Sequence, residues 1–345
     1  MTIAAPAPGG PPDEEVKASG PNALDRLTSL LADDLAQVNQ TIVDRMDSPV
    51  AVIPQLAGYI VASGGKRLRP LLTLASARLC GHEGARHIGL ATAVEFIHTA
   101  TLLHDDVVDE SAMRRGRASA NELFGNKSSV LVGDFLFARA FRLMVEDGSL
   151  AVLHTLSSAS AVIAEGEVLQ LSASNDTATT EDTYTQVIAA KTAELFAAAC
   201  EVGGLVADRD ADDVAALRQF GMNLGMAFQL VDDVLDYSAL QARLGKSVGD
   251  DFRDGKITLP VVIAIQDGSE EERAFWRRTL EDQAIGEGDL DHAIDLLKRH
   301  RALDRAVDQA RIFADAAMRC LDRFADSPIK AALLAVVSFC VERDY

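Results

Sequence analysis

The feature that most limits the fold of this chain is a long stretch without proline. Of its ten prolines, none falls between Pro70 and Pro260, and alanine and leucine are abundant there. Proline costs about 3 kcal/mol inside an α-helix, whereas alanine and leucine favour one. Strict apolar–polar alternation, the pattern of half-buried strands, is nearly absent. The sequence therefore predicts an all-α fold.

Glycine-rich breaks divide the chain into roughly a dozen expected helices. Residues 1–22 are rich in proline, glycine and alanine and have almost nothing to bury, so we predict a disordered N-terminal tail. Residues 23–345 are expected to form one domain, because a helical fold around one cavity can reach this size.

The composition excludes several classes of partner. Acidic residues number 52 against 33 basic ones, which argues against nucleic acid, since phosphate backbones attract clustered cations. The longest apolar run, Ala331 to Cys340, is too short for a membrane span, which needs about 20 residues. The four cysteines lie far apart without a CxxC pair, so we expect reduced thiols in a cytoplasmic protein.

An Asp-Asp-x-x-Asp pattern occurs twice within apolar helical sequence. The two copies are Asp105, Asp106 and Asp109, and Asp232, Asp233 and Asp236. Carboxylates four residues apart on a helix repel each other, and burial increases that cost. One copy alone would fit an acidic stripe on a wet surface, but two buried copies favour metal sites. Oxygen ligands suit Mg²⁺, which takes further oxygens from water and substrate phosphates. The predicted metal ligands are Asp105, Asp109, Asp232 and Asp236.

Helical phase supports two facing polar stripes. His98, Asp105 and Asp109 fall within about 40° of one another on one helix face. Gln229 is followed at helical spacing by the aspartates of the second motif, which also form one stripe. Two such helices would make the walls of one polar cavity mouth.

Several basic residues accompany the motifs, and each has an ordinary alternative reading. Lys66 and Arg69 belong to a cluster that fits either phosphate binding or a solvated patch. Arg114 and Arg115 follow the first motif and could instead pair with nearby acids. Lys191 and Thr192 lie in an apolar segment, where a cation is costly unless it meets an anion. Lys246 and Lys256 flank a glycine-rich segment that fits a lid or a surface loop.

Together these motifs resemble the trans-isoprenyl diphosphate synthase (polyprenyl synthetase) family. The resemblance runs from about residue 24 to the C-terminus, and GGKRLRP, FIHTATLLHDDVVDESAMRRG, VLVGDF, EGEVLQL and KTAELF are similar to its long-chain, octaprenyl-like branch. It implies the class I isoprenoid synthase fold, a helical bundle around a deep central cavity, and a homodimer. It also implies a prenyltransferase that joins isopentenyl diphosphate to an allylic prenyl diphosphate, with three Mg²⁺ ions. The implied product is a long-chain all-trans polyprenyl diphosphate that supplies quinone side chains.

The resemblance also implies roles for single residues. The isopentenyl diphosphate would be held by Lys66, Arg69, His98 and Arg115. The allylic diphosphate would be held by Arg114, Lys191, Thr192 and Gln229, and Lys246 and Lys256 would close over the leaving diphosphate. The implied catalytic set is Asp105, Asp106, Asp109, Arg114, Lys191, Asp232, Asp233 and Lys246. Glu165, Glu167 and Gln170 are expected near the cavity without an assigned role.

Product length depends on residues below the first motif. Ala100 and Thr101 lie about one turn, roughly 6–7 Å, below Asp105, and their small size leaves a tunnel open. Phe137, Phe141 and Met144 share a helix face and are predicted to form its floor, although plain core packing explains them equally well. A short-chain synthase making farnesyl or geranylgeranyl diphosphate is the alternative.

Three other functions fit the sequence less well. A class I terpene cyclase would need an aromatic cavity, whereas aromatic residues make up only 5% of this chain. Head-to-head synthases carry a different acidic motif. A catalytically silent partner subunit would tend to lose metal-binding aspartates, and both motifs are intact here. The apolar segment from Phe96 to Leu103 is a candidate dimer interface by analogy alone.

Overall fold

Helices make up nearly all of the regular structure in the computed structural model, which describes residues 22–62, 65–114, 117–238 and 248–342. The first half contains α1 (Ala23–Leu30), α2 (Ala32–Arg45), α3 (Val52–Ala62), α4 (Leu68–Leu79), α5 (Arg86–Val108), α6 (Ala120–Phe124), α7 (Asn126–Asp147) and α8 (Leu150–Ala173). The second half contains α9 (Glu181–Ile188), the π-helical turn η1 (Ala189–Ala193), α10 (Glu194–Val206), α11 (Ala211–Asp236), α13 (Asp250–Arg253), α14 (Leu259–Asp267), α15 (Glu270–Trp276), the π-helical turn η2 (Arg277–Glu281), α16 (Asp289–Arg299), α17 (Ala302–Cys320) and α18 (Pro328–Val341). In the described part of the chain, strands are limited to the two-residue pair β1 (Met113–Arg114) and β2 (Arg117–Ala118). The predicted all-α class is confirmed.

Caps and prolines explain where several helices begin. The Asn22 side chain accepts a hydrogen bond from the Asp25 amide and so caps α1, although Asn22 is the last residue of the predicted tail. Pro70, Pro260 and Pro328 each lie in the first turn of a helix, where the missing N–H has no helical partner to lose. The proline-free stretch therefore runs from the start of α4 to the start of α14.

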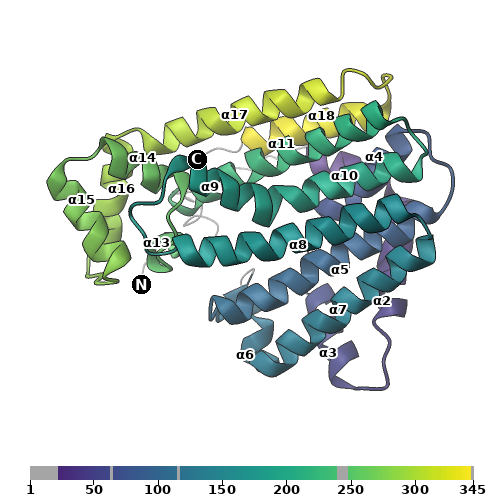
Figure 1. The fold of residues 1–345 in the computed structure, drawn as a ribbon, viewed down its shortest axis with the longest axis horizontal. Helices are drawn as coiled ribbons and strands as arrows, with labels where there is room; N and C mark the ends of the chain where they lie inside the picture. The colour runs from purple at the N-terminus through teal and green to yellow at the C-terminus, as the bar shows by residue number, and fades with distance from the viewer. Residues whose placement is uncertain (1–21, 63–64, 115–116, 239–247, 343–345) are drawn as a thin grey trace, which may run out of the picture.

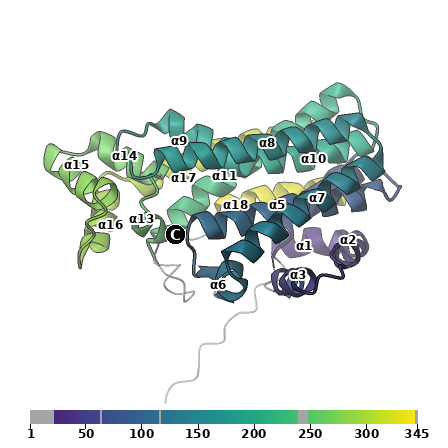
Figure 2. The same cartoon turned by 60° about the horizontal axis from the view of Figure 1, so that its bottom comes forward.

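The long helices lie side by side, and shorter helices cover the two ends of the bundle (Figure 1). α5 packs along α7, and α10 contacts α4, α8 and α11. The helices α14, α15 and α16 form a lobe at one end, and α1, α2 and α3 lie near the other end (Figure 2). Two buried apolar clusters result, and α11 contributes its first half to one and its second half to the other.

The segment from Phe96 to Leu103 does not form an exposed interface. The side chains of Phe96, Ile97, Ala100 and Leu103 are buried within the chain, because α4, α7 and α10 pack around α5. The dimer-interface prediction for this segment is therefore wrong. Exposed large apolar side chains gather instead on α7 and α8, and include Leu131, Phe141, Val145, Leu150, Val168 and Leu171.

The structure also bears on the sequence predictions about the cysteines and about membrane-spanning segments. All four cysteines are free. Within the described residues, no helix combines the length and the apolarity that crossing a membrane requires.

Candidate active site

A cavity of about 560 Å³ lies between the ends of the long helices. Side chains from α4, α5, β1, α8, α9, η1, α11, α13 and the segment after α13 line it. The predicted site residues on its wall are Arg69, His98, Thr101, Asp105, Asp109, Arg114, Lys191, Thr192, Gln229, Asp232, Asp233 and Lys256. Lys66, Asp106 and Asp236 are not on this wall, and Arg115 and Lys246 lie outside the described residues. The structure thus brings together residues that are as far as 187 positions apart in the chain, from Arg69 to Lys256.

Both acidic motifs lie at the C-terminal ends of long helices. α5 ends at Val108 with Asp109 as its C-cap, and α11 ends at Asp236. A helix C-terminus already carries partial negative charge on its free carbonyls, so carboxylates there are unfavourable without a cation. Burial raises the pKa of Asp105 to about 7, and the nearby Lys191 ammonium opposes this only in part. Burial also raises the pKa of Asp233 to about 7.

These carboxylates suit partly hydrated divalent cations. Within the described residues, no group of three or more ligating side chains converges on one point. Each bound ion would therefore take only some of its ligands from the protein, as Mg²⁺ does when it bridges carboxylates, waters and phosphates. Burial, and after it the neighbouring carboxylates Asp233 and Asp236, raise the pKa of Asp251. Bound divalent cations would relieve this crowding of acidic groups.

The two motif aspartates that are not on the cavity wall, Asp106 and Asp236, are each held by protein groups. Asp106 is buried, and its Oδ1 accepts a hydrogen bond of 2.6 Å from Nε of Arg114. The two carboxylate oxygens of Asp236 accept hydrogen bonds from the amides of Asp250 and Asp251, at 3.3 and 3.0 Å. Asp236 therefore holds the start of α13 against the end of α11. Arg114 pairs with Asp106, which is one of the nearby acids that the sequence offered as its alternative partners.

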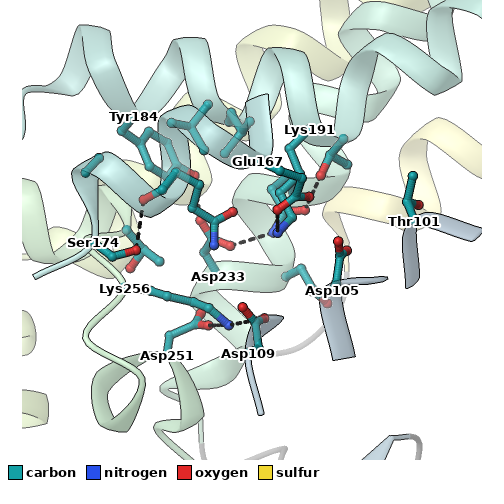
Figure 3. Close-up of a pocket in the computed structure, with 18 of the residues that line it drawn as sticks. Thr101, Asp105, Asp109, Glu167, Ser174, Tyr184, Lys191, Asp233, Asp251 and Lys256 are labelled. Atoms are coloured by element: carbon teal, nitrogen blue, oxygen red, sulfur yellow. Dashed lines mark hydrogen bonds and ion pairs between the residues drawn. The ribbon is translucent and has the colours of Figure 1, made fainter. Parts of the chain in front are cut away.

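Lysines lie on two sides of the cavity (Figure 3). Lys191 Nζ lies 2.8 Å from Oε2 of Glu167 on α8. Lys256 Nζ lies 3.0 Å from Asp254 and 3.6 Å from Asp109 of the first motif. Burial disfavours the charged form of Lys256, but the acids around it outweigh burial and raise its pKa. Lys256 therefore stays charged at the mouth of the cavity.

Lys191 is presented by a π-helical turn, a feature often found at functional sites. The turn η1 inserts an extra residue between α9 and α10. It lies close to α8 at Gly166, where an added Cβ would be 2.8 Å from Ala190 Cβ and 2.9 Å from Lys191 N. Glycine at this position allows the contact that brings Lys191 to Glu167.

The basic residues of the cluster around Lys66 have different surroundings: one supports the fold, one lines the cavity and one is exposed. Arg67 pairs with the buried Glu95 and so fixes the start of α4 to α5. Arg69 lines the cavity, with its guanidinium nitrogen 3.1 Å from Nε2 of His98 and its Cζ 4.5 Å from the centre of the Phe196 ring. Lys66 is exposed.

Sequence reasoning missed several residues on the cavity wall, including two with titratable side chains, and it left Glu167 and Gln170 without a role. Tyr184 and Asp251 were not predicted, and Glu167 had no assigned function. The position of Tyr184, seven residues before Lys191, is a helical spacing that could have identified it. The Tyr184 hydroxyl donates a hydrogen bond of 2.6 Å to Asp233 Oδ2.

The predicted floor of the tunnel does not take the expected form. Met144 is buried in the core, Phe137 is half-buried against the His104 ring, and Phe141 is 42% exposed. None of the three is on the cavity wall. This cavity therefore gives no support to the prediction that they form the tunnel floor, because the face of α7 that carries them runs from the core to the surface. Thr101 lines the cavity, whereas Ala100 is fully buried behind it.

Comparisons with known proteins agree with this fold. A family model described as polyprenyl synthetase matches residues 50–297. The octaprenyl diphosphate synthase of Escherichia coli (strain K12) is 46% identical over 321 residues, which cover 93% of this chain and 99% of that protein.

Solved structures give the same result. A decaprenyl diphosphate synthase from Rhodobacter capsulatus is 52% identical with a TM-score of 0.90, over 92% of this chain and 98% of that one. A polyprenyl synthase from Caulobacter crescentus CB15, complexed with calcium and isoprenyl diphosphate, is 50% identical with a TM-score of 0.90, over 94% of this chain and 99% of that one. This chain therefore belongs to the polyprenyl synthetase family.

Proposed function

We propose that this chain condenses isopentenyl diphosphate with an allylic prenyl diphosphate to give a long-chain all-trans polyprenyl diphosphate. The observation that carries the proposal is one cavity flanked by two acidic helix ends and by Arg114, Lys191 and Lys256. Such a cavity can bind a diphosphate both through metal ions held by the carboxylates and through the cationic side chains. A relative half identical to this chain binds calcium and an isoprenyl diphosphate, which supports the assignment.

The main requirement for catalysis is to stabilise the negative charge of the departing diphosphate. As the allylic C–O bond breaks, negative charge grows on the diphosphate, and groups that bind it better in the transition state lower the barrier. Mg²⁺, three ions by analogy, would neutralise part of this charge when held by Asp105, Asp109 and Asp232. Arg114 and Lys191 would exchange their carboxylate partners for phosphate oxygens.

The second substrate would be held by residues of other helices. Arg69 on α4 and His98 on α5 lie within hydrogen-bond distance of each other on the cavity wall. We propose that they bind isopentenyl diphosphate together with Lys66 and Arg115, and that Lys246 joins Lys256 on the allylic diphosphate. An Arg guanidinium binds phosphate oxygens in a bidentate manner, which fixes the direction from which the isopentenyl double bond is presented.

The long product is proposed from the small side chains below Asp105 and from the relatives. Two similar proteins are named octaprenyl and decaprenyl diphosphate synthases. Thr101 on the cavity wall leaves room for a growing chain. A quinone side chain is the proposed destination of the product.

Chain-length analysis of the products tests the proposal. Purified protein would be incubated with labelled isopentenyl diphosphate, farnesyl diphosphate and Mg²⁺. We expect a ladder that ends at a long product and disappears with EDTA. A product of one or two additions would refute the long-chain assignment but not the reaction. Folded protein that incorporates no label would refute the reaction and favour a silent partner subunit.

The oligomeric state and the compartment stay predictions. A homodimer is supported by the exposed apolar side chains on α7 and α8. Light scattering on the same preparation would measure its mass, and a monomer mass would refute the homodimer. The cytoplasmic location is supported by four free cysteines, and fractionation of cells would test it.

A further inference from the structure

A chain of hydrogen bonds runs through the wall of the cavity behind the second acidic motif. The Tyr184 hydroxyl on α9 donates to Oδ2 of Asp233 on α11 at 2.6 Å. The other oxygen of Asp233 accepts a hydrogen bond of 2.7 Å from the Gln229 amide nitrogen. The Gln229 carbonyl oxygen in turn accepts one of 2.9 Å from the Thr192 hydroxyl on η1.

The order of donors and acceptors fixes the direction of the Gln229 amide. Asp233 accepts a hydrogen bond at each of its oxygens, one from Tyr184 and one from the NH₂ of Gln229, so the Gln229 oxygen points towards Thr192. Tyr184 and Asp233 are only 5% and 4% exposed, so water does not readily replace a lost partner there. All four side chains also lie on the cavity wall, and the chain joins α9, η1 and α11.

We propose that Tyr184 is a positioning residue for the allylic substrate. It holds Asp233, and through Asp233 it sets the orientation of Gln229 and Thr192, the pair that the family resemblance assigns to the allylic diphosphate. This inference rests on the proposed function. Without the tyrosine hydroxyl, one Asp233 oxygen becomes free to accept a hydrogen bond from Gln229 in a second orientation. Gln229 then rotates, and Thr192 loses its fixed acceptor.

The test is Tyr184→Phe, which keeps the ring and removes only the hydroxyl. We expect the KM for the allylic diphosphate to rise about tenfold, the cost of one lost hydrogen bond to a buried charged group. The KM for isopentenyl diphosphate should stay within about twofold, because its proposed ligands lie on α4 and α5. Binding of an unreactive allylic thiodiphosphate, measured by calorimetry, should weaken by the same factor.

A double-mutant cycle separates positioning from general loss of stability. If Tyr184 acts through Thr192, then Tyr184→Phe should cost much less in a Thr192→Val background than in the wild type. Tyr237→Phe is the matched control, because Tyr237 is also buried beside these carboxylates but is not on the cavity wall. It should leave both KM values unchanged.

Two results would overturn the inference while leaving the proposed function intact. One is a Tyr184→Phe enzyme whose KM values both match the wild type or both rise equally. The other is a double mutant in which the two costs simply multiply. A wild-type protein that incorporates no isopentenyl unit would instead overturn the proposed function, and calorimetric binding of the thiodiphosphate would still test the role of Tyr184.

Discussion

Replacing Asp105 with alanine is expected to reduce turnover about a thousandfold, the upper range for losing one electrostatic group of an active site. Asp105 lines the cavity at the end of α5 and is a proposed metal ligand. The fold should survive, because the substitution removes a carboxylate whose pKa burial has raised to about 7. Initial rates of isopentenyl incorporation would measure the loss, and thermal unfolding would measure the stability.

Metal binding provides a second measurement for Asp105. In the wild type, Mg²⁺ added with an allylic thiodiphosphate should raise the melting temperature, and this rise should largely disappear in Asp105→Ala. Asp326→Ala is the control, because Asp326 has a fully exposed side chain in the loop before α18. An Asp105→Ala enzyme that keeps a tenth of the wild-type rate would rule out the proposed role.

Replacing Thr101 with phenylalanine is expected to shift the main product to a chain shorter by several isoprene units. Thr101 lines the cavity about one helical turn below Asp105, so an aromatic ring there would block the path of the growing chain. Thr101→Val, which has nearly the same volume, is the control and should leave the product length unchanged. Chromatography of the dephosphorylated products would measure both variants.

Ala100→Phe provides a useful contrast. Ala100 is 0% exposed and lies behind the wall, so a ring there would overpack the core and cost about 1–3 kcal/mol. We expect it to shorten the product as well, but with a lower melting temperature than Thr101→Phe. An unchanged product ladder in both variants would exclude α5 as the determinant of chain length.

The sequence predicted most of the fold because its signals are local and repeated. The proline-free stretch indicated helices, and the phase of His98, Asp105 and Asp109 predicted a shared face that the cavity wall indeed contains. Sequence spacing alone could not predict which side chains form hydrogen bonds with residues of other secondary-structure elements. Thus Asp106 was grouped with the catalytic aspartates although it pairs with Arg114, and Asp236 was predicted as a metal ligand although its oxygens hold two backbone amides.

Other features were not predictable from local patterns. The π-helical turn that presents Lys191 depends on its contact with Gly166 of another helix. The surroundings of the predicted tunnel floor also depend on other helices. Helical periodicity showed that Phe137, Phe141 and Met144 share a face, but packing against neighbouring helices decided which of them are buried.

The division of α11 between two apolar clusters has a consequence for cooperativity. Its first half packs in one cluster and its second half in the other, and Gln229 lies where the two meet. Proteins open locally in partly independent units, and two separate apolar clusters are candidates for such units. A diphosphate bound to Gln229 on one side and to Lys256 on the other would tie the two units together. The bound substrate would then cross-link the two clusters. Amide hydrogen exchange should therefore slow in both halves of α11 when the substrate binds.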